Sequence, residues 1–299
     1  MDDRRRTTSL LGAVLLLIVS GLGLAARQTP APSGWELVVL GIAQDAGIPQ
    51  IGCEQSPCKD IREGTRKPER VASIGLVNRA RGVSYLFDAT PDMVSQLGTL
   101  NGGRVPTGVF LTHGHIGHYT GLMYFGRESL DAKAVPVYGT ERMAGFLTFN
   151  GPWSQLVSRK NIDLRALKPD SSIRLEGGVM VTPFLVPHRD EFTDTVGYLI
   201  EGPRAKVLFI PDIDKWQKWN RNLRDYANEV DILLLDGTFS SLTELPGRNI
   251  SEVPHPLMTE TRALLANTKA QLWFIHLNHS NPALIDNTDV AREGMTFSL

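Results

Sequence analysis

Three histidines crowd into one short stretch of the sequence. His113, His115 and His118 lie within six residues of the segment Leu111–Gly121 (LTHGHIGHYTG). The apolar run Gly108–Leu111 leads into them and is typical of a buried strand, and the intervening glycines suit a tight loop at its end. Neutral imidazoles held close together are what a transition metal needs. The motif therefore predicts a metal site at the end of a strand.

The same arrangement, an apolar strand followed by a ligand-type residue, occurs three more times. His188 follows VTPFLVP, Asp212 follows KVLFIP and His276 follows LWFI. His279 does not follow this arrangement, and we expect it to be an ordinary core or surface residue. The pattern predicts that one metal centre collects the following ligands: His113, His115, His118, His188, Asp212 and His276.

The elements that must position these ligands are strand-rich, with helices between them. Hairpins are expected at the start of each half of the chain, the first between Val71–Asn78 and Val83–Asp88. Residues 151–160 are expected to be irregular, and residues 213–228 to be helical. Two sheets stacked face to face with helices outside would satisfy this order. The ligands would then lie at one rim of the sandwich.

Composition sets broad bounds on function. The chain has 299 residues, of which 31 are basic and 32 acidic. This balance gives no electrostatic signal for a polyanionic partner, so nucleic acid is not expected. About 270 residues remain after the N-terminal segment, which is enough for one large domain or two small ones.

Residues 1–26 have the features of a targeting segment. Three arginines precede the uncharged apolar stretch Leu10–Ala26, and Gly23 and Ala25 have the small side chains of a cleavage site. Cleavage predicts an exported protein, periplasmic or secreted. Without cleavage, the segment would anchor the chain to the inner membrane. Membrane contact is expected only through this segment, and only if it is not cleaved. Residues 27–34 form a short Pro-rich linker.

The sequence contains two cysteines, Cys53 and Cys58. In an oxidising compartment they could pair across a short loop. They could instead belong to a metal knuckle, but two ligands do not complete a tetrahedral site. We favour the disulfide, and neither interpretation makes the cysteines catalytic.

The histidine motif, followed in order by His188, Asp212 and His276, resembles the ligand pattern of the metallo-β-lactamase superfamily. Within it, the chain resembles the pyrroloquinoline quinone biosynthesis B proteins, in the stretches LGIAQDAGIPQIGC, LTHGHIGHYTGL, DGTF, VPHP, IHLNHSNP and AREGMTFSL. The resemblance covers nearly all of the chain after the targeting segment. It implies an α+β fold, the αββα four-layer sandwich, formed by residues 35–299 as one domain.

One departure from the superfamily pattern concerns the second metal. The pattern is His-x-His-x-Asp-His, and Gly117 stands where its aspartate, a ligand of the second metal, belongs. The resemblance therefore implies one complete site together with a weaker one, or a single metal. The first site would hold His113, His115 and His188, and the second only His118, His276 and the bridging Asp212.

Two further departures concern the subgroup. This chain keeps both His113 and His115, which the biosynthesis B proteins do not, and this favours an ordinary metal-dependent hydrolase. Those proteins also have a Cys-x-Cys-x-x-Cys knuckle in the early loop. Gln55 occupies its middle position here, which again favours a disulfide over a zinc site.

The ligand set indicates a mechanism. The expected cofactor is zinc, as one or two ions, with iron or manganese as alternatives. A metal held by three imidazoles lowers the pKa of its bound water to about 7. Asp212 could accept that water's proton. His255 is the candidate general acid, because superfamily phosphodiesterases place a helper histidine in this loop, although it could also be a plain loop residue. Asp45 could face the pocket or cap a turn.

Three functions follow from this reading. The first is hydrolysis of an ester, lactone, amide or phosphodiester in a small-molecule or peptide substrate, with Asp212 and His255 as catalytic residues. The second is metal-dependent oxidation of a peptide or cofactor precursor, which the subgroup resemblance implies. The third is a metal-binding protein without catalytic activity, which is suggested by Gly117 in place of the aspartate that binds the second metal. Fold alone does not choose among them.

Overall fold

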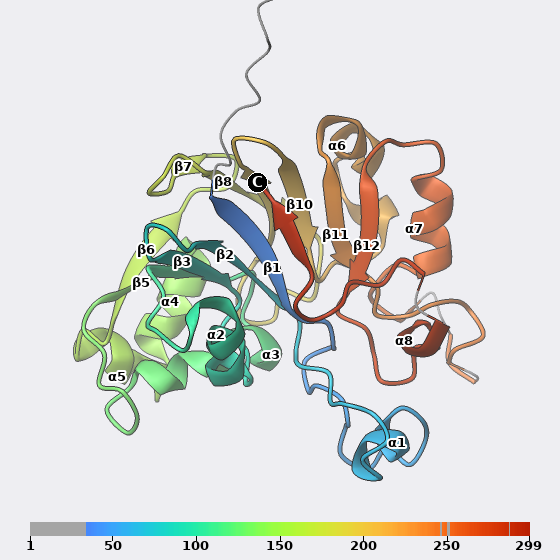
Figure 1. Ribbon diagram of the computed structural model, residues 1–299, viewed down its shortest axis with the longest axis horizontal. Helices are drawn as coiled ribbons and strands as arrows, with labels where there is room; N and C mark the ends of the chain where they lie inside the picture. The colour runs from blue at the N-terminus through green and yellow to red at the C-terminus, as the bar shows by residue number, and fades with distance from the viewer. Residues whose placement is uncertain (1–33, 246, 250–251, 287) are drawn as a thin grey trace, which may run out of the picture. The chain divides into compact units, whose positions relative to one another are not determined.

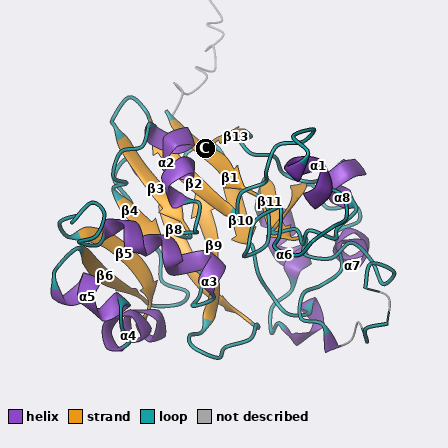
Figure 2. Ribbon diagram, turned by 90° about the horizontal axis from the view of Figure 1, so that it is seen from below, coloured by secondary structure: helices purple, strands orange, loops and turns teal. Residues whose placement is uncertain are grey.

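The computed structural model describes residues 34–299 apart from 246, 250–251 and 287. Within these residues, two β-sheets pack face to face (Figure 1, Figure 2). The first sheet has the strand order β13 (Thr296–Ser298), β1 (Trp35–Gly41), β2 (Ser73–Asn78), β3 (Val83–Phe87), β4 (Gly108–Phe110), β5 (Val135–Thr140) and β6 (Ile162–Leu167). The second has the order β12 (Gln271–Ile275), β11 (Ile232–Asp236), β10 (Lys206–Ile210), β9 (Thr195–Glu201), β8 (Met180–Val186) and β7 (Ile173–Arg174).

The strands that lead into the candidate ligands share one direction within each sheet. In the first sheet, β1 and β3 both run antiparallel to β2, and β4 runs parallel to β3. In the second sheet, β8 and β10 both run antiparallel to β9, while β10, β11 and β12 are parallel. The carboxyl ends of all these strands therefore meet at one edge of their own sheet, where α/β proteins commonly bind ligands.

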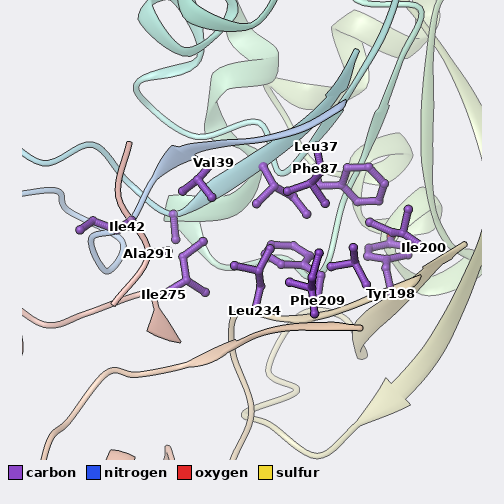
Figure 3. Close-up of a cluster of buried hydrophobic side chains, with 14 of the residues drawn as sticks. Leu37, Val39, Ile42, Phe87, Tyr198, Ile200, Phe209, Leu234, Ile275 and Ala291 are labelled. Carbon is purple, nitrogen blue, oxygen red and sulfur yellow. The ribbon is translucent and has the colours of Figure 1, made fainter. Parts of the chain in front are cut away.

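The core lies between the two sheets. Phe87 of β3 stacks on Phe110 of β4 with ring centroids 4.7 Å apart. It also meets Tyr198 and Phe209 of the opposite sheet edge-on, at 5.3 and 6.3 Å (Figure 3). The preceding residue, Leu86, points to the other face of its sheet and packs in a separate cluster beneath the helices. Alternation of this kind, with both faces buried, is expected of a sheet in the middle of a layered fold.

Helices cover both outer faces, so the sandwich has four layers. Figure 1 shows α2, α3, α4 and α5 on one side and α6 and α7 on the other. The α-helices are α1 (Cys58–Arg62), α2 (Met93–Asn101), α3 (Ile116–Tyr119), α4 (Glu141–Phe149), α5 (Trp153–Ser158), α6 (Leu223–Glu229), α7 (Met258–Leu264) and α8 (Ala283–Asp286), and the 3-10 helices are η1 (Thr120–Phe125) and η2 (Trp216–Lys218). The predicted αββα sandwich is confirmed.

Some predictions of individual helices and strands are confirmed, and others were wrong. The β2–β3 hairpin forms as expected. The prediction that residues 151–160 are irregular was wrong, because α5 lies there and buries Leu156 beneath the first sheet. A single helix over residues 213–228 was also wrong. Asn222 accepts a hydrogen bond from the backbone N–H of Arg224, so α6 begins after it and η2 stands apart. Strand β6, unforeseen, pairs along the edge of β5.

The early loop and the N-terminus complete the description. Cys53 and Cys58 form a disulfide with a Cα–Cα distance of 5.9 Å, as favoured from the sequence. The predicted targeting segment, residues 1–26, lies outside the described residues, as does the linker at 27–34 apart from Gly34. Among the residues that the structure describes, no helix has the length and apolar character needed to cross a membrane.

Candidate metal centre

Most of the sequence-predicted ligands follow the carboxyl end of a strand, at the same rim of the sandwich. His113 follows β4, His188 follows β8, Asp212 follows β10 and His276 follows β12. Their side chains are at most 2% exposed. His115 precedes the short helix α3 and His118 lies within it. The structure thus brings the six residues together, and their role as metal ligands stays a prediction.

Four of these residues form what we call the first metal group: His113, His115, His188 and Asp212. One potential ligand atom from each lies within 4.8 Å of the others. His113 Nε2 is 2.8 Å from His115 Nδ1 and 3.5 Å from Asp212 Oδ2. His188 Nε2 is 3.4 Å from Asp212 Oδ1. Three imidazoles and one carboxylate therefore converge on a single point.

A second metal group shares Asp212 and adds His118, His276 and Asp45. Asp45 Oδ1 lies 3.0 Å from His118 Nε2 and 3.3 Å from His276 Nε2. Asp212 Oδ2 lies 3.7 and 3.6 Å from the same two nitrogens. The sequence placed only His118, His276 and Asp212 in this group, and the structure adds the Asp45 carboxylate, which faces the centre from the loop after β1.

The donor atoms fit a metal. Both ring nitrogens of His188 are buried and make no hydrogen bond with any part of the chain that the structure describes. Buried polar atoms are almost always satisfied, so such orphans at a point of convergence indicate a missing partner. Several imidazoles with carboxylates are a donor set that zinc, iron and manganese accept.

Outer partners fix the rings of the buried histidines. Asp88, which follows β3, lies with Oδ2 2.8 Å from His118 Nδ1. The same carboxylate accepts from the Thr112 hydroxyl, whose oxygen is 2.9 Å from His113 Nδ1. The Nε2 atoms of both rings are thereby turned toward the metal groups. Orientation of this kind by a carboxylate or hydroxyl behind the ligand is usual in metal sites.

Two other histidines are oriented in the same way. His115 is turned the other way round, with Nε2 2.9 Å from Glu191 Oε2 and Nδ1 toward the first group. His276 Nδ1 lies 2.9 Å from the Thr238 hydroxyl, which leaves Nε2 for the second group. Every ring with an outer partner thus presents its other nitrogen to the centre.

The electrostatics separate the two groups. Burial lowers the pKa of His113 well below its usual range and that of His188 to about 4, so both rings are neutral at pH 7. Burial also opposes the charge of His118, but Asp88 and Asp45 raise its pKa well above the usual range. His113 and His188 are thus already in the form that binds metal, whereas a cation beside His118 must displace a proton.

His255, the predicted general acid, lies at the edge of the centre. Its Nδ1 is 2.8 Å from Asp236 Oδ2 and 3.2 Å from Asp212 Oδ1. Burial opposes its charge, yet the two carboxylates raise the pKa of His255 to about 10. Lys215 donates through Nζ to the His255 carbonyl at 2.8 Å and holds its backbone, which has a φ of 89°. A protonated ring held in this way is suited to donate a proton.

The family model described as "Beta-lactamase superfamily domain" matches residues 84–277, a range that spans the histidine motif and His276. The chain belongs to the β-lactamase superfamily. The predicted resemblance to that superfamily is confirmed.

Named relatives agree with this membership. "Coenzyme PQQ synthesis protein B" of Methylobacillus flagellatus is 26% identical over 311 residues, covering 87% of this chain and 99% of the relative. The crystal structure of Zn(2+)-bound PqqB from Methylobacterium extorquens has a TM-score of 0.75 at 22% identity, covering 88% of this chain and 100% of that one. A diphosphatase from the PhnP family has a TM-score of 0.65 at 21% identity, covering 88% and 96%.

Sequence reasoning missed three aspartates of this superfamily site. Asp45 was left open between the pocket and a turn, and Asp88 and Asp236 were not considered. Asp88 directly follows β3, and Asp236 is the last residue of β11. Both therefore obey the strand-end pattern that identified Asp212, and applying that pattern to every strand would have found them.

Proposed function

We propose that this protein is a metal-dependent hydrolase whose centre is built from the first and second metal groups. The observation that carries the proposal is the first group, where three buried imidazoles and a carboxylate converge. Zinc, as one or two ions, is the metal we propose. The donor set supports it, as does the zinc bound by the PqqB of Methylobacterium extorquens. Iron and manganese are alternatives that the same donors accept.

Bound zinc would supply a Lewis acid that activates water at neutral pH and polarises a carbonyl or phosphoryl oxygen. The chain's own residues orient the groups around it. Thr112 and Glu191 hold the outer nitrogens of His113 and His115, which fixes the two rings relative to each other. A rigid, buried first group needs little reorganisation when charge develops, and this is the largest source of rate enhancement in many enzymes.

Proton transfers fall to two side chains. The Asp212 carboxylate lies between the two metal groups, 3.5 Å from His113 Nε2 and 3.6 Å from His276 Nε2, and can accept the proton of the attacking water. His255 is held at Nδ1 by Asp236 and can protonate the leaving group. The ring of His255 lies 5.5 Å from that of His188 and 5.9 Å from that of His276, so it borders both metal groups. A general acid must come within hydrogen-bond distance of the leaving group, and a ring that borders both metal groups stands beside the place where that group would lie.

The substrates we propose are small molecules or peptides with an ester, lactone, amide or phosphodiester bond. The shared fold of the PhnP-family diphosphatase supports including phosphoesters among them. No nucleic-acid partner is proposed, because the chain has 31 basic and 32 acidic residues.

The test is metal analysis combined with a substrate screen. Zinc-loaded protein is assayed against panels of esters, lactones, amides and phosphodiesters, beside His113→Ala and the control Asp163→Asn on the edge strand β6. We expect turnover of one class, its loss in His113→Ala and its retention in Asp163→Asn. Bound zinc without turnover in any panel would instead support the metal-binding protein without catalytic activity.

A second candidate is metal-dependent oxidation of a peptide or cofactor precursor. The observation that favours it is the alignment with coenzyme PQQ synthesis protein B over 99% of that protein's length. Iron-loaded protein with a reductant and a peptide panel should then consume oxygen. If zinc-loaded protein hydrolyses a substrate and iron-loaded protein consumes no oxygen, the oxidation is excluded.

We also propose that the protein is exported, to the periplasm or beyond, and touches a membrane only if its N-terminal segment is retained as an anchor. The pairing of Cys53 with Cys58 supports this, since disulfides persist in oxidising compartments. Fractionation of cells that express the full chain tests it. Recovery of all the protein with an uncleaved N-terminus in the cytoplasm would contradict it.

A further inference from the structure

We propose that Asp45 is the fourth ligand of the second metal group, and that Gly117 lacks a side chain because the loop carrying Asp45 occupies its place. The inference rests on the metal centre of the proposed function and adds to it a complete second site. That site takes a divalent cation such as zinc, with two imidazoles and two carboxylates as ligands.

The position of Asp45 is the first argument. Its Oδ1 lies between His118 Nε2 at 3.0 Å and His276 Nε2 at 3.3 Å, while Asp212 approaches the same two nitrogens. Asp88 holds His118 at Nδ1, and Thr238 holds His276 at Nδ1. The Nε2 atom of each ring is therefore turned toward Asp45. The Asp45 oxygen thus lies close to two ring nitrogens of fixed orientation. One cation could be reached by all four side chains, those of Asp45, His118, Asp212 and His276.

The space at Gly117 is the second argument. A Cβ atom there would lie 2.6 Å from the Asp45 Cα, 2.7 Å from its Oδ1 and 2.8 Å from its Cβ. Contacts under 3.0 Å with backbone require the neighbour to move. A side chain at position 117 and the present loop therefore exclude each other, so the carboxylate of this site can come from one position or the other.

Backbone hydrogen bonds hold the loop that carries Asp45, and they fix the position of its carboxylate. The Gln44 N–H donates to the Leu277 carbonyl at 2.9 Å, and the Leu277 N–H donates to the Ile42 carbonyl at 2.8 Å. These bonds tie the loop to the residue that follows His276. The two ligands Asp45 and His276 are thus held in register although 231 positions separate them.

Asp45 also connects the second site to solvent. Its side chain is 33% exposed, and it lines a cavity of about 240 Å³ with Gln50, Leu277 and His279. The Asp212 side chain is only 2% exposed. An ion in the second site would therefore exchange through the cavity, while the first site stays closed.

The experiment measures zinc per chain and the two zinc affinities for the full chain. The variants are Asp45→Ala and Asp45→Asn, which remove the donor, and Gly117→Ala, which displaces the loop but keeps every donor side chain. The matched controls are Asp163→Asn on the edge strand β6 and Gly98→Ala in α2, where an added Cβ has no neighbour within 4 Å. Thermal melts without metal establish which variants fold.

We expect about two zinc ions per wild-type chain. Both Asp45 variants and Gly117→Ala should weaken the second ion by more than about tenfold and leave the first unchanged. The controls should bind as the wild type does. If Gly117→Ala does not fold, the Asp45 variants decide the outcome. Wild-type affinity for both ions in Asp45→Ala overturns the inference. If the wild type binds one zinc ion and the Asp45 variants bind that ion equally well, the inference about Asp45 is overturned and the proposed function stands. If the wild type binds no zinc, both the inference and the proposed function are overturned.

Discussion

The two metal groups share Asp212 but are assembled in different ways. The histidines of the first group come from two strand ends, with His113 and His115 only two residues apart. The second group combines the histidine motif with His276 and with Asp45, which lies 73 positions before His118. The first group therefore takes two of its four ligands from one short segment, whereas the four ligands of the second group come from four separate parts of the chain.

Exposure follows the same division. His113 and Asp212 are 2% exposed, whereas the Asp45 side chain is 33% exposed. A buried site that includes the neutral imidazoles of His113 and His188 should hold its ion tightly. A site completed by an exposed carboxylate on a loop should hold its ion less tightly and exchange it faster. The predictions below test this contrast, beginning with the residue that both groups share.

Asp212→Asn should have the largest effect, because the substitution removes a charge from both groups. We expect the affinities for both ions to fall and turnover to drop by about 10³-fold. Metal analysis and kcat/KM on the substrate found in the screen measure this. Asp214→Asn, two residues on and paired with Lys218 at the surface, is the matched control. Loss of one ion alone would show that Asp212 does not bridge.

His255→Gln should separate catalysis from metal binding. Removal of a general acid typically costs about 10²-fold in kcat or more, while zinc content should stay at the wild-type value because neither metal group contains this ring. The loss should be smaller for substrates whose leaving group needs no proton. A uniform loss across good and poor leaving groups would mean that His255 positions Asp212 instead.

Asp88→Asn tests the buried support of both groups. Asp88 holds the His118 ring directly and the His113 ring through Thr112. Outer partners of metal ligands contribute about 10- to 100-fold to affinity, so each ion should weaken within that range. Competition with a chelator of known affinity gives the numbers. Unchanged affinities would show that the rings are held by packing alone.

Glu191→Gln should have the smallest effect. Glu191 supports His115 as Asp88 supports His118, but its side chain is 47% exposed. Water can replace an exposed partner, and the pair contributes little. We expect the first ion's affinity to change by about threefold or less, with the second ion unaffected, in the same chelator assay. A loss as large as that of Asp88→Asn would contradict the link between burial and affinity.

Much of this architecture could be predicted because each piece depends on short-range pattern. The apolar strand before each ligand and the hairpin of β2 and β3 are visible in the sequence, and they lead to the sandwich and to the rim. Asp88 and Asp236 follow the same pattern and could have been found. Cys53 and Cys58 were correctly paired because few residues separate them.

Other features depend on contacts that no local pattern records. Helix α5 exists because Leu156 packs beneath the first sheet, although Gly151 and Pro152 indicated an irregular segment. Strand β6 carries polar residues on its exposed face and forms only because β5 offers an edge. Asp45 reaches the centre only because backbone bonds fasten its loop to Leu277. Because Asp45 lies 73 positions before His118, the histidine motif alone gave no sign of a carboxylate that could stand in for the one missing at Gly117.

Anomalous diffraction at the zinc edge, from crystals of the protein grown with zinc, tests the central claim most directly. The account predicts one peak enclosed by His113, His115, His188 and Asp212, and a second, weaker peak enclosed by Asp45, His118, Asp212 and His276. Full zinc occupancy elsewhere on the chain, with no peak between these side chains, would contradict it.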